Sequence, residues 1–113
     1  MLYMLLICYD PTAPPDPNNR NRQPEHAALE QEMRDAGKYA GGAGLFPVAV
    51  TVRRRGGEDA IVTDGPFAET KEAIGGFFVV DCEEDDAIAY AKRISVDNRS
   101  WVEVQPIALW HPL

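Results

Sequence analysis

His26 is one of only two histidines in this 113-residue sequence, and an imidazole is the side chain best suited to proton transfer near neutral pH. Its spacing to Leu29, Met33 and Ala36 is that of one face of a helix, the face expected to lie against a sheet. Two interpretations are open. His26 acts as a general base or acid at the edge of a cleft, or it packs against the sheet as an ordinary residue at the start of a helix.

Asp64 is the better candidate partner for His26, because it opens the turn-forming sequence Asp-Gly-Pro at residues 64–66. Aspartate can bond to its own backbone, glycine tolerates a positive φ, and proline fixes the exit from the turn. The carboxylate is then held at the end of a strand, either as a cap for the turn alone or also as a site residue. Asp35 lies nine residues after His26. Nine residues turn it to the opposite side of an ideal helix, about 13 Å along the axis, so a direct bond is excluded and a solvated carboxylate is favoured.

Further polar residues follow the turn, namely Glu69, Thr70 and Lys71. They either orient the acid or hydroxyl groups of a ligand or form a solvated loop. Arg53 begins a run of three arginines before Gly56, which predicts a solvated hairpin tip or, for Arg53, a contact with an anion. The histidines are isolated, and no Ser/His/Asp spacing, HExxH, phosphate-loop or dinucleotide pattern is present, so we expect no metal and no cofactor.

Charge and cysteine content restrict the partners and the compartment. Eighteen acidic against eleven basic residues give a net charge of −7, so we expect binding to neither nucleic acid nor membrane. The apolar opening at residues 1–8 is too short for a signal or a membrane span and is typical of a buried first strand. Cys8 and Cys82 lie in apolar surroundings without CxxC spacing, a pattern of buried free thiols that favours a cytoplasmic location.

The elements that must position these residues follow one another in the order β-α-β-β-α-β, within a single domain covering residues 1–113. We expect strands at residues 2–8 and 48–53, a third that returns at 60–63 and resumes at 75–81, and a last at 101–109. Helices are expected at 24–36 and from the acidic run 83–86 to 94, with an irregular loop at 11–23 and a flexible turn at 41–44. This order predicts an α+β ferredoxin-like fold, in which both helices cover one face of an antiparallel sheet. The other face would be apolar, because we expect it to carry the valines of residues 48–52, Trp101 and Phe77 or Phe78. This predicts a homodimer with two sheets packed face to face.

The segment Val62–Glu72, which contains DGPFAETKE at residues 64–72, resembles the signature of the DGPF group in the YCII-related superfamily. The resemblance extends to the opening strand at residues 3–7, the glycine-rich segment 41–45, residues 51–53 and the closing strand 102–107. It implies a bacterial, cytosolic, dimeric α/β barrel whose biochemical function is largely unassigned. Within the signature we include Phe67 among the candidate ligand contacts.

The resemblance also implies two kinds of function. Some members of the family accompany extracytoplasmic-function sigma factors, which suggests a non-catalytic ligand-binding or regulatory module. A few relatives are lyases on small aromatic compounds with a proposed His/Asp pair, and His26 and Asp35 occupy the matching positions. The present sequence differs from the common pattern at Ala43, where an acid is often found, and in the proline-rich loop at residues 11–23.

Overall fold

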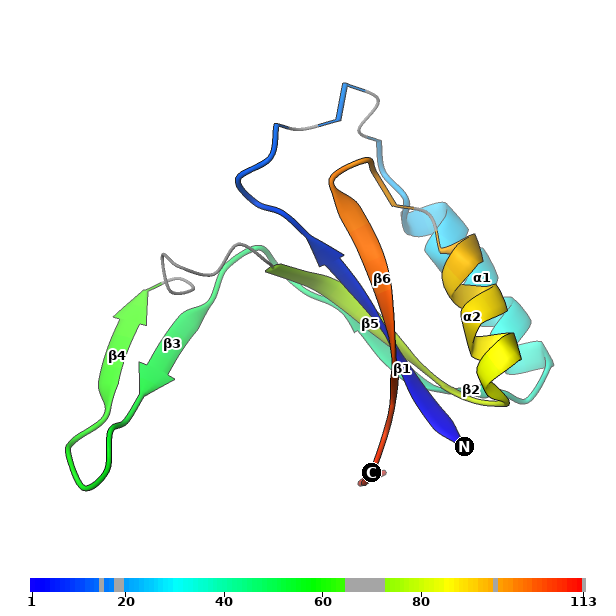
Figure 1. Cartoon of the computed structure of the whole chain (residues 1–113). Helices are drawn as coiled ribbons and strands as arrows, with labels where there is room; N and C mark the ends of the chain where they lie inside the picture. The colour runs from blue at the N-terminus through cyan, green and yellow to red at the C-terminus, as the bar shows by residue number, and fades with distance from the viewer. Residues whose placement is uncertain (15, 18–19, 65–72, 95, 113) are drawn as a thin grey trace.

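The computed structural model describes residues 1–14, 16–17, 20–64, 73–94 and 96–112. They form an α+β arrangement of a four-stranded sheet, two helices and a separate two-stranded hairpin (Figure 1). The strands are β1 (Leu2–Tyr9), β2 (Tyr39–Gly44), β3 (Val50–Arg53), β4 (Ile61–Asp64), β5 (Ala73–Asp81) and β6 (Ser100–Pro106), and the helices are α1 (Gln23–Asp35) and α2 (Glu84–Arg93).

The four-stranded sheet has the order β2-β5-β1-β6, and every neighbouring pair is antiparallel. The first strand of the chain therefore lies inside the sheet, where Leu5 stands opposite Phe78 on one side and Val104 on the other. Both faces of β1 also carry buried side chains, Leu5 on the helix side at 0% exposed and Cys8 on the other side at 3%, as expected for a strand that is apolar on both alternations. This confirms the prediction of a buried first strand.

Both helices lie on the same side of the sheet in Figure 1, and they share one core with it. Met33 of α1 and Ala87 of α2 are fully buried against the sheet, as is Leu5 of β1. The core consists of Tyr3, Leu5, Leu29, Met33, Phe78, Val80, Cys82, Ala87 and Ile94. Burial of this apolar surface is the main force that holds the helices to the sheet.

The helix ends follow from local sequence. Pro24 occupies the first turn of α1, and Gly37 after its end has a φ of +70°, which a glycine adopts without strain. The backbone N–H of Lys38 donates to the carbonyl of Met33 at 2.9 Å, so the end of the helix is satisfied in the Schellman manner. Helix α2 has three acids in its first turn and two basic residues in its last, matching the helix dipole.

Two expectations about the strands differ from the structure. Residues 41–44, predicted as a flexible turn, belong to β2, because pairing with β5 supplies the hydrogen bonds that make even a glycine-rich segment extended. Residues 48–53 and 60–63 contain β3 and β4, and their antiparallel pairing confirms the predicted hairpin. They form a two-stranded sheet of their own, however, and do not join the main sheet as expected. The valines of this segment therefore do not line the main sheet. We call residues 45–64 the arm.

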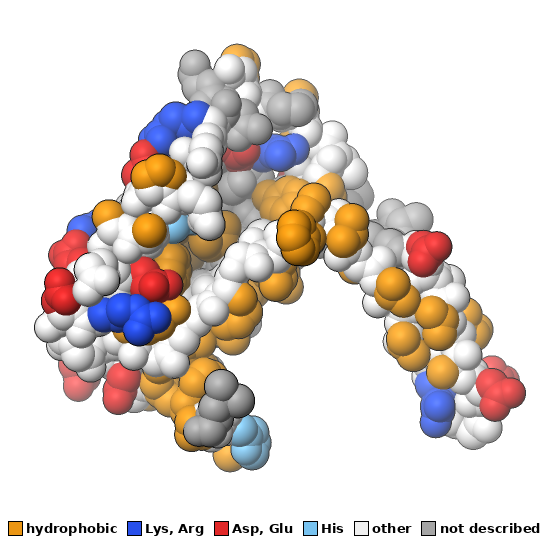
Figure 2. Space-filling view, turned by 180° about the vertical axis from the view of Figure 1, so that it is seen from behind, with side chains coloured by type: hydrophobic (Ala, Val, Ile, Leu, Met, Phe, Trp, Pro, Cys, Tyr) orange, Lys and Arg blue, Asp and Glu red, His pale blue; other side chains and the backbone are white. Residues whose placement is uncertain are grey.

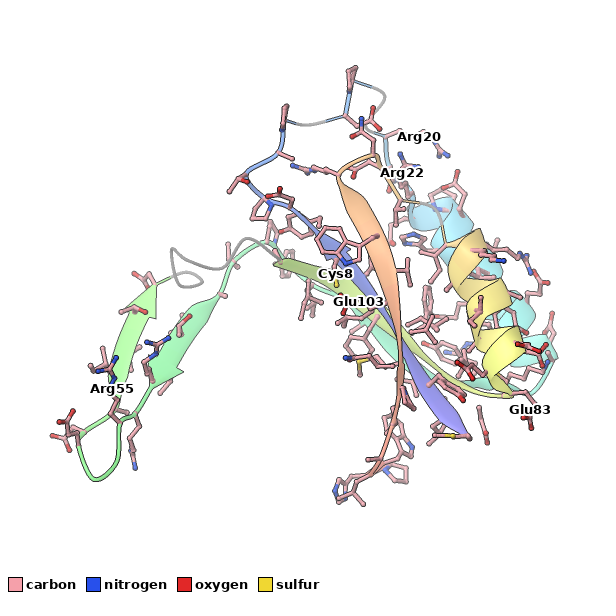
Figure 3. The ribbon with its side chains drawn as sticks, viewed as in Figure 1. Cys8, Arg20, Arg22, Arg55, Glu83 and Glu103 are labelled. Atoms are coloured by element: carbon pink, nitrogen blue, oxygen red, sulfur yellow. The ribbon has the colours of Figure 1, made fainter. Side chains whose placement is uncertain are left out.

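The sheet face turned away from the helices carries the alternate residues of β1, β5 and β6. We call it the open face, and it includes Met4, Leu6, Cys8, Phe77, Val79, Trp101 and Glu103. Val79 and Cys8 are already buried in the single chain, and the other five residues are half-buried. Neither helix covers it, and in Figure 3 Cys8 and Glu103 lie on the side of the sheet opposite α1 and α2. The strand β6 ends at Pro106, three residues earlier than predicted.

Candidate functional site

A cleft of about 730 Å³ opens between the start of α1 and the sheet. Its floor is formed by Ile7 and Phe78, with residues 42–44 and 75–76 at one side. The segment before α1 and the turn before β6 complete the walls, through Arg22 and Asp97. A cavity of this size suits a small organic molecule, because pockets for such ligands usually measure about 300–1,000 Å³.

The cleft exists because glycines occupy the sheet positions beneath the start of α1. Gly44 stands opposite Gly76, and Gly76 stands opposite Ile7, whose side chain packs on the helix side of the sheet. Directly opposed residues of antiparallel strands point to the same face, so Gly44 and Gly76 leave that face without side chains. A Cβ added at Gly44 would meet nothing within 4 Å.

His26 lies in the cleft wall, in the first turns of α1, and is half-buried. Its ring meets the Phe78 ring edge-on, with the ring centroids 6.1 Å apart and the planes at 88°. Phe78 is a core residue, 7% exposed, and therefore offers a fixed surface for this contact. The prediction that His26 lies on the helix stripe facing the sheet is confirmed, and the ring borders a space large enough for a ligand.

Glu30, one helical turn after His26, lines the same cleft. The Tyr39 hydroxyl donates to its Oε1 at 3.1 Å, and Arg34 donates from Nε to its Oε2 at 3.2 Å. Burial and then the bond to Glu30 raise the pKa of Tyr39, so the phenol stays protonated as the donor. Arg34 also lies over the Tyr39 ring, 4.3 Å from its centroid, so the three side chains fix one another.

Asp97 lies in the opposite wall of the cleft. The Ser100 hydroxyl donates to its Oδ1 at 2.5 Å, the backbone N–H of Arg99 to the same oxygen at 3.1 Å, and the Arg99 guanidinium to Oδ2 at 3.3 Å. Burial raises the pKa of Asp97, but these hydrogen bonds outweigh it and hold the pKa below its usual value. The carboxylate is thus an anchor for the turn that leads into β6.

Arginines stand at the rim of the cleft. Figure 3 shows Arg20 and Arg22 at the start of α1, well away from Arg55 in the arm. Arg20 forms an ion pair with Glu25, and the hydrogen bond from Arg20 lowers the pKa of that carboxyl. Arg22 lines the cleft next to the positive end of α1 and favours a ligand that carries an acidic group, while the carboxylates Glu30 and Asp97 line the same cleft.

The other predicted site residues lie away from this cleft or outside the described part of the chain. Asp35 is exposed in the last turn of α1, where it accepts a 2.9 Å hydrogen bond from the Gln31 amide. Arg53 and Asp64 are exposed on the arm, and neither lines the cleft of its own chain. Phe67, Glu69, Thr70 and Lys71 lie outside the described residues. The pairing of His26 with Asp64 stays a prediction.

The residues that sequence reasoning missed are Glu30, Arg22, Asp97 and Ser100, all of which line the cleft. The spacing of four residues from His26 to Glu30 was the available signal, because such pairs share a helix face. Nothing local marked Asp97, since it reaches the cleft through the fold. Among the described residues, no group of three or more His, Cys, Asp or Glu side chains is placed to hold a metal ion. No helix in the described part of the chain is long and apolar enough to cross a membrane.

The fold and the site together define a small α+β domain with one open sheet face and a histidine-bearing cleft beneath the start of its first helix. The sequence matches the YCII-related domain over residues 1–111, and the chain belongs to this family. It is 43% identical over 91 residues to an uncharacterized protein of Rhizobium meliloti (strain 1021), an alignment that covers 76% of this chain and 73% of that protein.

Proposed function

We propose that this YCII-related protein binds a small organic molecule in the cleft and that His26 exchanges a proton with it. The observation that supports this proposal is the position of the His26 ring at the wall of a space of about 730 Å³. Ile7 and Phe78 offer an apolar floor for the body of the ligand, and the arginines at the rim favour an acidic substituent. The expected ligand class is thus a small acid with a flat, apolar part.

The chemistry that suits a single imidazole is elimination or hydrolysis. In an elimination, the His26 nitrogen takes a proton from carbon, the C–H electron pair forms the double bond, and the leaving group departs from the adjacent carbon with its bonding pair. In a hydrolysis, the same nitrogen takes a proton from the attacking water while the water oxygen bonds to the electrophilic atom and the leaving group departs with its electrons. Neither reaction requires a metal or a redox cofactor.

The second candidate function is ligand binding without turnover, as in a regulatory module linked to a sigma factor. One observation favours it: Glu30, the carboxylate one helical turn after His26, is already held by Tyr39 and Arg34. Asp35 and Asp64 do not line the cleft of their own chain. If Asp64 pairs with His26 as predicted, we expect it to come from a second copy.

We further propose that the chain works in the cytoplasm as a homodimer with the ferredoxin-like, dimeric α/β-barrel arrangement. The strand order β2-β5-β1-β6 with both helices on one face supports it, as does the apolar content of the open face. Cys8 and Cys82 are buried and form no disulfide with each other, which fits a reducing compartment.

The test is a screen of small aromatic and aliphatic acids by thermal shift, followed by NMR titration of His26→Gln and His111→Gln. His111, the other histidine, is exposed near the end of the chain and provides a matched control. We expect compounds that stabilise the wild type and His111→Gln but bind more weakly to His26→Gln. If a bound compound is also converted, the rate should fall by about 10²–10⁴-fold in His26→Gln. Ligands that bind both variants equally would contradict the role of His26, and binding without conversion would favour the regulatory function.

A further inference from the structure

We propose that the arm docks on a second copy of this chain and buries its apolar face there, and that this contact fixes one wall of the cleft. The inference rests on the homodimer proposed above and goes beyond it, because it names the segment that makes the contact and ties it to the site. The arm stands apart from the body of the molecule in Figures 1 and 2.

The two faces of the arm differ in polarity. On one face Val52 stands opposite Val62 and Val50 opposite Asp64. On the other face Thr51 stands opposite Thr63 and Arg53 opposite Ile61. The three valines are 62–64% exposed. Alternation of this kind is typical of strands with one face buried, and an isolated two-stranded hairpin is marginally stable in water. The arm therefore has a largely apolar face that the described residues of its own chain leave exposed.

The chain exposes more surface than a compact monomer of its mass, and the excess is large enough to be an interface with a second copy. The chain exposes 8058 Å². A compact monomer of 12.5 kDa is expected to expose only about 6,200 Å². The excess is roughly 1,900 Å² per chain, about twice the roughly 800 Å² that each partner buries in a standard interface. For two chains it comes to about 3,800 Å², which lies within the total of about 2,000–5,000 Å² that obligate dimers bury. The radius of gyration of 16.1 Å likewise exceeds the roughly 13 Å expected for a compact domain of this length.

Charge and symmetry favour a second copy over an unrelated partner. The arm tip carries Arg53, Arg54 and Arg55 against two acids, Glu58 and Asp59, in a chain whose net charge is −7. The open face carries Glu103, half-buried beside Trp101. A two-fold axis would bring each basic arm tip towards an acidic partner and would cover both open faces at once.

The start of the arm contributes two side chains to the cleft. Leu45 and Phe46 are the first residues of the arm after β2, line the cleft, and are 48% and 87% exposed. An anchored arm holds both side chains in place over the ligand space, so the cleft is complete only in the dimer.

The experiment compares Val62→Asp with Thr63→Asp by analytical ultracentrifugation over a range of protein concentrations. These neighbouring residues of β4 are both exposed in the single chain, and only Val62 lies on the apolar face. We expect dimers for the wild type and Thr63→Asp, and a dissociation constant raised about 100-fold or more for Val62→Asp, because an unpaired carboxylate would be buried at the contact. Equal dissociation constants for the two variants would overturn the docking of the arm, and a monomeric wild type would overturn the dimer as well.

Hydrogen exchange of the unmodified chain gives a second, independent readout. Amides of β3 and β4 should be protected at concentrations where the chain is dimeric and lose protection on dilution. Arm amides that exchange freely in the dimer, or stay protected in the monomer, would refute the proposal. A dimer that behaves as expected but binds no small acid would leave the arm contact standing and remove the proposed function of the cleft.

Discussion

The ring of His26 meets the edge of the Phe78 ring with their centroids 6.1 Å apart, which ties the proposed site to the core of the molecule. Phe78→Leu should remove this contact while keeping an apolar side chain in the core. We expect a loss of about 1–2 kcal/mol in the free energy of unfolding. We also expect a changed environment for the His26 ring in NMR spectra. Phe77→Leu, on the adjacent residue that points to the open face, is the control and should leave the His26 resonances in place.

Gly76 is expected to tolerate no side chain. An added Cβ would lie 2.6 Å from the Ala43 carbonyl oxygen and 3.2 Å from the Gly44 Cα, both of them backbone atoms that cannot move without shifting β2. Gly76→Ala should therefore destabilise the protein by about 1–3 kcal/mol, measured by chemical denaturation. Gly75→Ala is the matched control, since its nearest contact is the Tyr9 ring at 3.7 Å. Similar losses for both variants would show that the close approach of β2 and β5 is not the cause.

Gly44 offers a way to fill the cleft without disturbing the fold. It lies on the helix side of β2, and a Cβ there would meet nothing within 4 Å. Gly44→Val should lower the affinity for a cleft ligand at least tenfold, by titration calorimetry, while the melting temperature stays close to that of the wild type. Gly41→Ala lies on the open face, where the nearest contact would be Trp110 at 3.9 Å, and should bind normally. Unchanged affinity in Gly44→Val would place the ligand elsewhere.

Asp97 should make stability depend on pH in the acidic range. Its folded-state pKa lies below the ordinary value of 3.8, so the unfolded chain binds more protons between the two values. The stabilisation that Asp97 provides is complete above the unfolded value and is lost as pH falls through the folded value. Asp97→Asn should cost about 1–2 kcal/mol at neutral pH and progressively less in acid. Asp59→Asn, exposed in the arm, serves as the control. A constant difference between wild type and Asp97→Asn at all pH values would refute this role.

Much of the fold could be predicted from sequence because hydrophobic periodicity and helix-end chemistry are local. The stripe of Leu29 and Met33 identified α1, and the acidic run from Glu83 identified the start of α2. The segment Tyr39–Gly44 was misread because glycines normally signal a turn, and only the pairing with β5 makes it a strand. Val50 and Val52 alternate with polar residues, as in a strand with one buried face, but no local sequence pattern shows which sheet that strand joins.

The site was harder to predict because most of it is assembled across the chain. His26 was found from its residue type and its helix stripe, and Glu30 could have been found from the same spacing. Asp97 and Gly76 enter the cleft only once β1, β5 and β6 are paired, which no local pattern encodes. The space itself comes from side chains that are absent from the sheet, and an absence of this kind becomes visible only in three dimensions.

The interior position of β1 has a consequence for how the chain folds. Its partners, β5 and β6, lie far along the sequence, as the pairs Leu5–Phe78 and Leu5–Val104 show. During synthesis β1 stays unpaired until most of the chain has been made, because neither β5 nor β6 exists before then. The closing of these long loops also slows folding, towards roughly the millisecond-to-second range. Until then an unpaired strand with apolar residues on both faces is exposed to other chains. We therefore expect stalled nascent chains that lack β5 to aggregate or to recruit a chaperone, and chains that include β6 to be released folded.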